Sequence, residues 1–564
     1  MADLPFLVVI ETQRVKSYLF ASRFLRETRG ASLLLDRLNR IETRKILKRM
    51  KGQEIYLGGG SGRALFQTED QATEFARAVR ELYREATWNA RVSVEVVARL
   101  SGESFPAWMA RGVGESRKNK LERFEAVPLL GGRWIRPCTS CGQEPAEEIL
   151  PEAQERHRLC LSCLKKREEV KAFYGSVKRN FDLKTPIPTA GALRKAWPDF
   201  ILTTLAEQVE RMPEPGRRPL LPRDFDGIGE VSRPRNYFAF LYADGNRMGE
   251  TIRAMSETFQ GDEEARQAYA SFSAIVDRAT REAAVEAVLQ EVEIHEETTR
   301  QGERGLFISA EFVVAGGDDL ILVVPAQAGL GVAERFLSTF QSRSLELQKE
   351  AVHRGELAKC FAPEGLTTSA GMILCHSSYP ASQLVDMAAE LMKLAKHRAA
   401  DLAAAGTFEG TLDFIALPES GSEEIKRRRK REYEGTLPSG RPLRRTERPY
   451  TAREVGELRE RILAFKDSSV PRSKLKALYA VLFRSLAEAQ FEALRIRERL
   501  QATRDLERSS ALRKLVDELP LFPFREDGNG AWSTPLSELI ELYDFVHERP
   551  GPLGVAEVGE RSDA

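Results

Sequence analysis

Two glycines and two aspartates interrupt an apolar run in the sequence FVVAGGDDLILVVP, residues 312–325. A Gly-Gly turn between two apolar segments predicts a tight β-hairpin, because glycine adopts the positive φ angles that such turns need and lets other atoms approach closely. This explains the glycines but not the aspartates. One aspartate in a turn commonly bonds to the local backbone, whereas two adjacent carboxylates beside buried strands require a further reason.

The chain repeats one order of elements, β-α-β-β-α-β, which is the ferredoxin-like unit. Apolar periodicity and turn residues define both copies. The first copy has a strand at 5–13, helices to about 50, a hairpin at 55–66, a helix at 69–88 and a strand at 91–100. The second has a strand at 236–246, a helical region at 249–300, the hairpin at 312–325, a helix at 331–350, a strand at 366–375 and an amphipathic helix at 381–399, and residues 411–417 could add one more strand.

We interpret this repeat as a duplication. From a comparison by eye of YLGGGSGRALF in the first hairpin with VAGGDDLILVV in the second, we expect Ser61 and Gly62 to stand where Asp318 and Asp319 stand. The first copy then has the turn glycines without the carboxylates. The alternative is that any two ferredoxin-like units look alike without a common origin.

A third carboxylate accompanies the pair. Asp244 ends the predicted strand NYFAFLYADGN, and in a ferredoxin-like unit this strand lies beside the central hairpin. Asp244 is therefore predicted to lie near Asp318 and Asp319. Three clustered carboxylates repel one another unless a cation neutralises them, and oxygen ligands without His or Cys indicate Mg²⁺ or Mn²⁺. Two such ions suit phosphoryl transfer, so the three aspartates are the candidate catalytic and metal-binding residues.

Four further residues are candidates for contacts with a nucleotide. Gly316 and Gly317 allow close approach at the turn, and Ser369 lies in a predicted strand within TSAG. Lys396, on the last turn of the amphipathic helix, could reach triphosphate oxygens, although a solvated lysine would fit the same position. The candidate site thus combines metal ligands with groups that could hold a nucleoside triphosphate.

Four cysteines form a second candidate metal site. CTSC carries Cys138 and Cys141, and CLSC carries Cys160 and Cys163. Two CxxC pairs at this spacing predict a zinc ribbon, in which four thiolates hold one structural Zn²⁺ and leave no open position for catalysis. The alternatives are two disulfides or free thiols. Six cysteines in 564 residues do not look like a disulfide framework, so a reducing, cytoplasmic setting is the simplest interpretation.

The overall charge identifies no partner. Lysine and arginine number 85 against 84 acids, a net charge of +1, so any contact with nucleic acid must come from local patches. The runs KRRRKRE (426–432) and SGRPLRRTERP (439–449) could meet RNA phosphates or a protein, or could be solvated linkers. No apolar run approaches the roughly 20 residues of a membrane span, and no signal peptide is evident.

The segments ADGNRMGE, AGGDDLILVVP, TSAGMILCHSSYP and AAELMKLAK, in this order, resemble the catalytic palm domain of the large subunit of type III CRISPR effector complexes, the Csm/Cmr large subunit. The segment ETQRVKSYLFASRFLRETRGASLLLDRLNR is similar to the degenerate opening palm of that family, and RPYTAREVGELRERI resembles the start of its helical C-terminal domain. The resemblance covers most of the chain. A Gly-Gly-Asp-Asp motif alone is shared with many palm polymerases, but the ordered set is specific.

These features together predict an α+β multidomain fold. It comprises two ferredoxin-like palm domains, a helical insert that contains the zinc ribbon, and a helical C-terminal domain. The expected boundaries are 1–115 for the degenerate palm, 116–235 for the zinc-binding and linker domain, 236–425 for the catalytic palm, and 426–564 for the basic linker and the helical C-terminal domain.

The resemblance also implies a function. Similar proteins bind ATP between two palms and make cyclic oligoadenylate second messengers when a CRISPR RNA-guided complex has captured a target transcript. Carried over to this chain, Asp244, Asp318 and Asp319 would hold two Mg²⁺ or Mn²⁺ ions, and Ser369 and Lys396 would contact the nucleotide. The implied partners are the other subunits of the complex and, through them, CRISPR RNA and target RNA, with no membrane.

One departure and two alternatives accompany this interpretation. Many family members begin with an HD nuclease domain, but no His-Asp dipeptide occurs here, so we expect no DNase activity. The alternatives are another palm-type nucleotide cyclase or polymerase, such as a diguanylate-cyclase-like enzyme, and a non-catalytic scaffold subunit. The internal duplication argues against a symmetric diguanylate cyclase, and the intact set of three aspartates argues against an idle scaffold.

Overall fold

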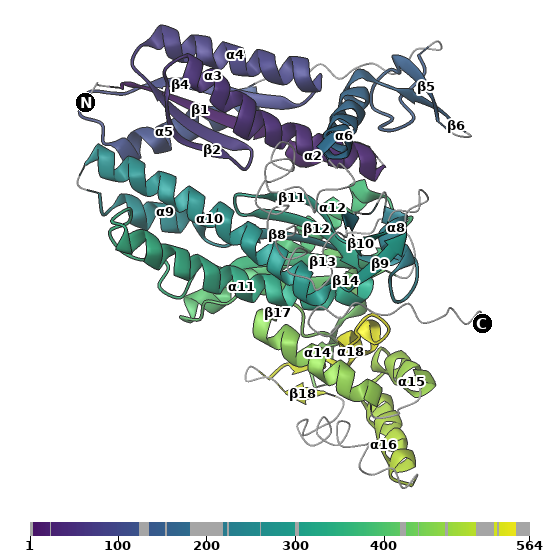
Figure 1. Ribbon diagram of the computed structural model, residues 1–564. Helices are drawn as coiled ribbons and strands as arrows, with labels where there is room; N and C mark the ends of the chain where they lie inside the picture. Colours follow the sequence, from purple (N-terminus) through teal and green to yellow (C-terminus); the bar gives the residue numbers. More distant parts are fainter. Residues whose placement is uncertain are drawn as a thin grey trace.

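The structure, a computed structural model, describes residues 4–22, 24–122, 135–152, 155–180, 218–220, 222, 225–259, 261–298, 304–417, 425–437, 439–467, 472–502, 524–526 and 530–548. The parts of the expected domains that fall in 181–217, 503–523 and 549–564 lie outside the described residues. Along the chain, a first α/β unit is followed by a second one and then by a group of helices (Figure 1). None of the described helices combines the length and the apolar character that a membrane span requires.

The first α/β unit, called the first palm below, is an antiparallel four-stranded sheet covered by helices. Its elements are β1 (Phe6–Gln13), α1 (Val15–Leu19), α2 (Leu25–Asp36), the π-helix η1 (Arg37–Glu42), α3 (Thr43–Arg49), β2 (Gln53–Gly58), β3 (Ser61–Phe66), α4 (Glu69–Thr87), β4 (Arg91–Ala98) and α5 (Phe105–Glu122). The strand order β2-β3-β1-β4 is that of the predicted ferredoxin-like unit. Helix α4 shows how the sequence sets this packing, because Thr68 caps its first turn and Phe75 and Val79 are buried on one face.

The second unit, called the second palm below, repeats this order and extends it. Its elements are β8 (Tyr237–Gly245), α9 (Met248–Ser256), α10 (Asp262–Glu291), β9 (Ile294–Thr298), β10 (Arg304–Ile308), β11 (Glu311–Gly316), β12 (Asp319–Pro325), α11 (Ala326–His353), β13 (Thr368–His376), α12 (Ala381–Ala404) and β14 (Thr411–Ala416). Its sheet has the order β11-β12-β8-β13-β14 and then the short strand β17 (Tyr450–Thr451). The expected strand at 411–417 is therefore present as β14. The helix expected up to residue 300 ends earlier, because β9 pairs with β10 in a small separate sheet that also includes β7 (Arg218–Leu220).

Both palms carry the same irregularity in the hairpin ladder. The register shifts between Glu54 and Tyr56 in the first palm, and between Phe312 and Val314 in the second. In each case the shift begins four residues before the glycine that opens the turn. Bulges of this kind are specific features of a fold rather than defects, so their coincidence supports a duplication over a chance likeness of two ferredoxin-like units.

The hairpin turns correct the alignment that the sequence suggested. In each ladder, the residue that closes the turn comes three positions after the glycine that opens it, and this residue is Ser61 in the first palm and Asp319 in the second. Ser61 therefore corresponds to Asp319, and Gly60 corresponds to Asp318. The predicted counterparts, Ser61 and Gly62, are wrong by one residue. The two turns have the same length, so the last of the three consecutive glycines occupies the place of the first aspartate.

Strand β8 connects two hydrophobic cores, because successive side chains of a strand point to opposite faces. Ala239 and Leu241 belong to a core that includes residues of α10 and α11. Phe240 and Tyr242 belong to a second core, which continues into the first palm at Val8. The two palms thus share buried apolar surface, and this burial fixes their relative placement.

The cysteine-bearing insert packs on the first palm. It consists of β5 (Glu148–Glu152), β6 (Glu155–Leu159) and α6 (Leu161–Asn180). Helix α6 lies against α2 so closely that a β-carbon on Gly30 would be 1.9 Å from the carbonyl oxygen of Lys166. An ion pair between Arg37 Nε and Glu169 Oε1, 2.7 Å apart, joins the insert to η1. The insert is therefore attached to the first palm rather than suspended between the palms.

The C-terminal region is helical, as predicted, with an additional small sheet. Its elements are α13 (Ile425–Glu432), β15 (Glu434–Thr436), β16 (Pro442–Arg444), β17, α14 (Ala452–Asp467), α15 (Arg472–Leu482), α16 (Leu486–Ala502), β18 (Arg525–Glu526), β19 (Trp532–Ser533) and α18 (Leu536–Leu542). The four-stranded sheet has the order β15-β16-β19-β18. Its strands are two or three residues long, too short to be read from a period-2 pattern.

Candidate active site between the two palms

The structure brings together the three aspartates that the sequence singles out. Asp244 is next to last in β8, and Asp319 begins β12, the neighbouring strand. Asp318 precedes β12 in the turn. A β-carbon on Gly245 would lie 2.9 Å from the β-carbon of Asp318, so the Asp318 side chain packs against the backbone that follows Asp244. Residues separated by more than 70 positions in the chain thus meet at one end of the sheet.

The cluster is electrostatically strained. Burial raises the pKa of Asp318 to about 6, and the nearby Asp244 carboxylate adds to this shift. Burial also raises the pKa of Asp319 to about 7, with further contributions from Asp244 and Asp318. The Lys16 ammonium group and the Tyr242 hydroxyl act in the opposite direction on Asp319. Carboxylates that are hard to ionise because they face one another are typical of a site that holds a cation.

Lys396 contacts Asp244 directly. Its Nζ lies 2.6 Å from Oδ2 of Asp244 and also donates to the carbonyl oxygen of Gly245, 2.9 Å away. The alternative of a solvated lysine does not hold, because the side chain is about two-thirds buried and paired. Lys396 fixes the orientation of one of the three carboxylates.

Ser369 does not face a cavity. The residue is fully buried on β13, where its hydroxyl donates to Asn246 Oδ1 at 2.8 Å and lies 2.8 Å from Thr411 Oγ1. The predicted strand position of Ser369 is correct, but the sequence does not show which side of the sheet its hydroxyl faces. In this placement Ser369 holds the loop after Asp244 through Asn246, and it offers nothing to a nucleotide.

The glycine turns of the two palms touch. Gly59 and Gly317 have φ angles of +58° and +63°, which favour glycine. A β-carbon on Gly59 would lie 3.2 Å from the backbone nitrogen of Gly317. A β-carbon on Gly316 would lie 3.1 Å from Nη2 of Arg40 in the first palm. The glycines expected to admit a nucleotide therefore also permit close contact between the palms.

Sequence reasoning missed Lys16, which the first palm contributes to the aspartate cluster. Its Nζ hydrogen-bonds to the hydroxyl of Tyr242 and lies 4.1 Å from the centroid of the Tyr242 ring. The Tyr242 hydroxyl in turn donates to Asp319 Oδ1, 3.4 Å away. No local pattern could have shown this contact, because 226 positions separate Lys16 from Tyr242.

A cavity of about 560 Å³ lies between the palms beside the aspartates. Arg40, Tyr56 and Ser61 of the first palm line it, as do Tyr269 and Asp318 of the second. Its volume is within the range of small-molecule sites. Asp319 instead lines a smaller neighbouring cavity of about 110 Å³, together with Lys16. The paired carboxylates thus border two cavities, each formed by residues of both palms.

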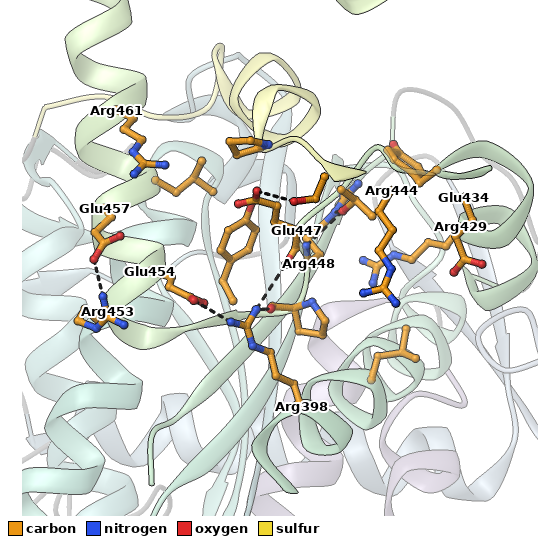
Figure 2. Close-up of a pocket in the computed structure, with 18 of the residues that line it drawn as sticks. Arg398, Arg429, Glu434, Arg444, Glu447, Arg448, Arg453, Glu454, Glu457 and Arg461 are labelled. Atoms are coloured by element: carbon orange, nitrogen blue, oxygen red, sulfur yellow. Dashed lines mark hydrogen bonds and ion pairs between the residues drawn. The ribbon is translucent and has the colours of Figure 1, made fainter. Parts of the chain in front are cut away.

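A larger cavity, about 800 Å³, lies elsewhere, between the second palm and the C-terminal region (Figure 2). Four of its charged side chains pair with one another. Arg398 pairs with Glu454 and Arg453 pairs with Glu457, each at 2.7 Å. Arg429, from the basic run 426–432, pairs with the fully buried Asp413. This part of the two basic runs therefore joins domains, and we do not place the active site there.

The four cysteines converge as their spacing predicts. The sulfur atoms of Cys138, Cys141, Cys160 and Cys163 all lie within 4.8 Å of one another. Within the described part of the chain, no other group of three or more His, Cys, Asp or Glu residues brings its ligand atoms this close. Three of the four cysteines are buried. Four sulfur donors in this arrangement fit one tetrahedral Zn²⁺ with no open position.

Polar contacts join the cysteine cluster to helices α1 and α2. The hydroxyls of Ser22 and Ser140 lie 2.7 Å apart, and Lys166 Nζ donates to the carbonyl oxygen of Tyr18 at 2.6 Å. Arg167 also pairs with the buried Glu27 at 2.5 Å. Helix α1 carries Lys16, so the cysteine cluster supports the segment that reaches the aspartates.

Comparison with known families agrees with this geometry. Residues 237–403 match the family described as Cas10/Cmr2, second palm domain. The matched segment contains all three aspartates, together with Ser369 and Lys396. The chain therefore carries a polymerase-like palm of the Cas10/Cmr2 type. This confirms the resemblance to the large subunit of type III CRISPR effector complexes.

Solved structures similar to this chain include Csm1–Csm4 cassettes. The cassette in complex with cA4 is 14% identical, with a TM-score of 0.48, and the match covers 96% of this chain and 70% of the other. The cassette with one ATP is 13% identical, with a TM-score of 0.47 and the same coverage. Csm1 in T. onnurineus is 13% identical, with a TM-score of 0.46 and again 96% and 70% coverage. Comparison with curated protein sequences gives no match.

Proposed function

We propose that this protein is a metal-dependent nucleotidyltransferase that converts ATP to cyclic oligoadenylates, acting as the large subunit of a type III CRISPR RNA-guided complex. One observation carries the proposal. Asp244, Asp318 and Asp319 converge beside a cavity of about 560 Å³ that both palms line. A site between two palms can hold two nucleotides, one as acceptor through its 3′-hydroxyl and one as donor with pyrophosphate as leaving group.

The aspartate cluster fits Mg²⁺ or Mn²⁺. Its donors are carboxylate oxygens, the hard ligands that these ions prefer. Burial, together with the neighbouring carboxylates, raises the pKa values of Asp318 and Asp319, so a bound cation would favour their ionised forms. When bound, two such ions would activate the attacking hydroxyl and offset the charge of the triphosphate.

Residues of the chain prepare the site in three ways. Lys396 orients the Asp244 carboxylate by the 2.6 Å contact, and Lys16 with Tyr242 favours the ionised form of Asp319. Asp318 borders the cavity itself. The first palm, which has glycine and serine in place of the two turn aspartates, is proposed to bind a nucleotide without turning it over.

We further propose the partners that the family resemblance implies. These are other subunits of the effector complex and, through them, CRISPR RNA and target RNA. The four cysteines are proposed to hold one structural Zn²⁺, since their sulfur atoms lie within 4.8 Å of one another.

The test is incubation of the complex, purified from its native host with bound RNA, with each of the four labelled nucleoside triphosphates and Mg²⁺ or Mn²⁺. Of the four nucleotides, we expect only labelled ATP to give a cyclic oligonucleotide. We expect the variant Asp318→Ala/Asp319→Ala to assemble normally and to give no product. A cyclic dinucleotide from GTP would favour the diguanylate-cyclase alternative. A complex that captures target RNA but makes no product from any nucleotide would favour the scaffold alternative.

A further inference from the structure

Helix α10 holds the turn that carries the aspartates. Asp277 Oδ1 accepts a hydrogen bond from the backbone N–H of Gly317 at 2.9 Å. One helical turn further on, Thr280 Oγ1 donates to the carbonyl oxygen of the same Gly317 at 2.7 Å. Both polar groups of the residue immediately before Asp318 are thus bound by one face of one helix.

In the part of the chain that the structure describes, the equivalent hairpin of the first palm has no such helix contact. The equivalent turn of the first palm is closed by the same ladder, and there Gly60 O accepts from Thr12 N–H of its own strand β1 at 2.7 Å. Within the described residues, no side chain bonds to the backbone of Gly59, the counterpart of Gly317. The palm without the aspartate pair lacks the helix contact, and the palm with the pair has it.

Arg40 of the first palm contacts Asp277. Arg40 Nη2 lies 2.8 Å from Asp277 Oδ1, and Arg40 Nε lies 2.7 Å from Asp36 Oδ1 on the preceding helix. The Arg40 and Asp277 side chains are 20% and 25% exposed, which makes the pair less open to solvent than a typical surface ion pair. Arg281 also lies 3.2 Å from Asp277 on the same helix. Asp277 is therefore bound from the first palm and from α10 itself.

We propose that Asp277 is a positioning residue for Asp318, and that Arg40 makes this positioning depend on the placement of the first palm. The inference rests on the proposed metal-dependent function. By fixing the Gly317 peptide, Asp277 and Thr280 limit the directions in which the next side chain can present its carboxylate. Outer partners of metal ligands typically change metal affinity about 10–100-fold when they are removed. The contact between the palms would in this way determine how well the second palm holds its cations.

The test uses Mn²⁺ alone as the probe, with binding to the full chain measured by isothermal titration calorimetry and by the loss of the free-ion electron paramagnetic resonance signal. Asp277→Ala is expected to weaken Mn²⁺ binding about 10-fold. Thr280 is fully buried and does not line the cavity, and Thr280→Val keeps the shape of its side chain. This variant should weaken Mn²⁺ binding by about 3-fold, less than Asp277→Ala does. Arg40→Gln should weaken binding, and Arg40→Lys should restore part of it.

The matched control is Asp262→Ala. Asp262 lies on the same helix and also pairs with the first palm, through Arg99, but at the far end from the turn. It should leave Mn²⁺ binding unchanged. If Asp277→Ala and Thr280→Val bind Mn²⁺ as tightly as Asp262→Ala, the positioning role is wrong.

Two further outcomes separate this inference from the proposed function. In a double-mutant cycle, Arg40→Gln should weaken Mn²⁺ binding of Asp277→Ala by less than about 2-fold more, because both act through one contact. Additive effects would show that Arg40 does not act through Asp277. If wild-type Mn²⁺ binding is unaffected by Asp318→Ala/Asp319→Ala, the metal site itself fails. That result overturns the proposed function, whereas unchanged binding in both Asp277→Ala and Thr280→Val, in a protein whose aspartates do bind Mn²⁺, overturns only the inference.

Discussion

Glu11 occupies in the first palm the sheet position that Asp244 occupies in the second. Glu11 pairs across the sheet with Ser93 on β4, and Asp244 pairs with Ser369 on β13. The degenerate palm therefore keeps an acid at this position although it lacks the turn pair. There the carboxylate has protein partners, because Arg63 Nη2 lies within 3.4 Å and Ser116 Oγ on α5 within 3.3 Å.

The two acids should differ sharply in their effect on catalysis. Asp244→Asn should lower product formation at least about 100-fold, because the proposed metal ligand loses its charge. Glu11→Gln should change it less than 3-fold, an effect of about 0.6 kcal/mol, because no second carboxylate faces Glu11 in the turn. The measurement is the initial rate with labelled ATP at saturating Mn²⁺. Equal losses in the two variants would mean that the first palm also holds a catalytic cation.

The stability of the metal-free protein should fall as the pH rises through the titration of the turn aspartates. Their pKa values in the folded state, about 6 for Asp318 and about 7 for Asp319, lie above the unfolded value of 3.8. Between these values the folded state binds more protons than the unfolded state, so the free energy of unfolding decreases with rising pH. Thermal unfolding in EDTA from pH 4.5 to 8 measures this.

The variant Asp318→Ala/Asp319→Ala is the control for that pH series. It should lose this part of the pH dependence and be more stable than the wild type in EDTA at pH 8. Added Mn²⁺ should raise the unfolding temperature of the wild type more at pH 8 than at pH 5.5, since the ion competes with protons for the carboxylates. A wild type and variant with parallel pH profiles would show that the carboxylates are not strained.

Removal of Lys16 should make metal binding more sensitive to acid. Lys16 lowers the pKa of Asp319 against the effects of burial and of the neighbouring aspartates. Lys16→Met should therefore raise that pKa above its present value of about 7 and move the midpoint of Mn²⁺ binding to higher pH. Lys45→Met, which removes an exposed lysine of the same palm, is the matched control and should leave the midpoint in place. Binding titrations at pH 6.5, 7.5 and 8.5 distinguish the two.

The sequence was sufficient for features that depend on local chemistry. The turn glycines, the apolar strands around Asp318 and the spacing of the four cysteines each follow from what neighbouring residues can do, and the structure has all three. One detail of the first hairpin was wrong, because Gly60 and Ser61, rather than Ser61 and Gly62, correspond to the two aspartates.

Several contacts between distant segments could not be predicted. Lys16 reaches Tyr242 across 226 positions, and Arg40 reaches Asp277 across 237. Ser369 was expected at the nucleotide, but a polar residue in a strand can bond within the sheet as readily as face a cavity. The placement of two domains decides such contacts, and no periodicity in one chain encodes it.

Loss of the proposed zinc site should loosen the first palm around α1 and α2. Cys160→Ser should reduce bound zinc from one ion per chain to nearly none, because a structural site with three thiolates binds far more weakly. Hydrogen exchange in α2 and α6 should rise, since Gly30 and Lys166 pack directly at that contact. Cys360→Ala, outside the cluster, is the control for thiol loss. If mass spectrometry finds the same zinc content in Cys160→Ser as in the wild type, the four cysteines are not the zinc site.

The stability of the C-terminal region should depend on Arg448 far more than on Arg453. The Arg448 side chain is 1% exposed and pairs with the fully buried Glu538 at 3.1 Å and with Glu541 at 3.1 Å, whereas the Arg453–Glu457 pair is 66% and 44% exposed. Arg448→Met leaves the buried carboxylate of Glu538 and the partly exposed one of Glu541 without their cation, a loss of about 3–5 kcal/mol in the free energy of unfolding. Arg453→Met removes an exposed pair and should cost less than about 1 kcal/mol.

Urea denaturation followed by tryptophan fluorescence measures this difference. Trp532 on β19, in the small sheet of the C-terminal region, serves as a reporter. Burial raises the pKa of Glu538 to about 7, so the loss in Arg448→Met should shrink at pH 5.5, where this carboxyl takes up a proton and no longer requires a cation. The effect of Arg453→Met should not change over the same pH range. If the two variants lose equal stability at pH 8, the buried arginine does not stabilise the C-terminal region more than an exposed one does.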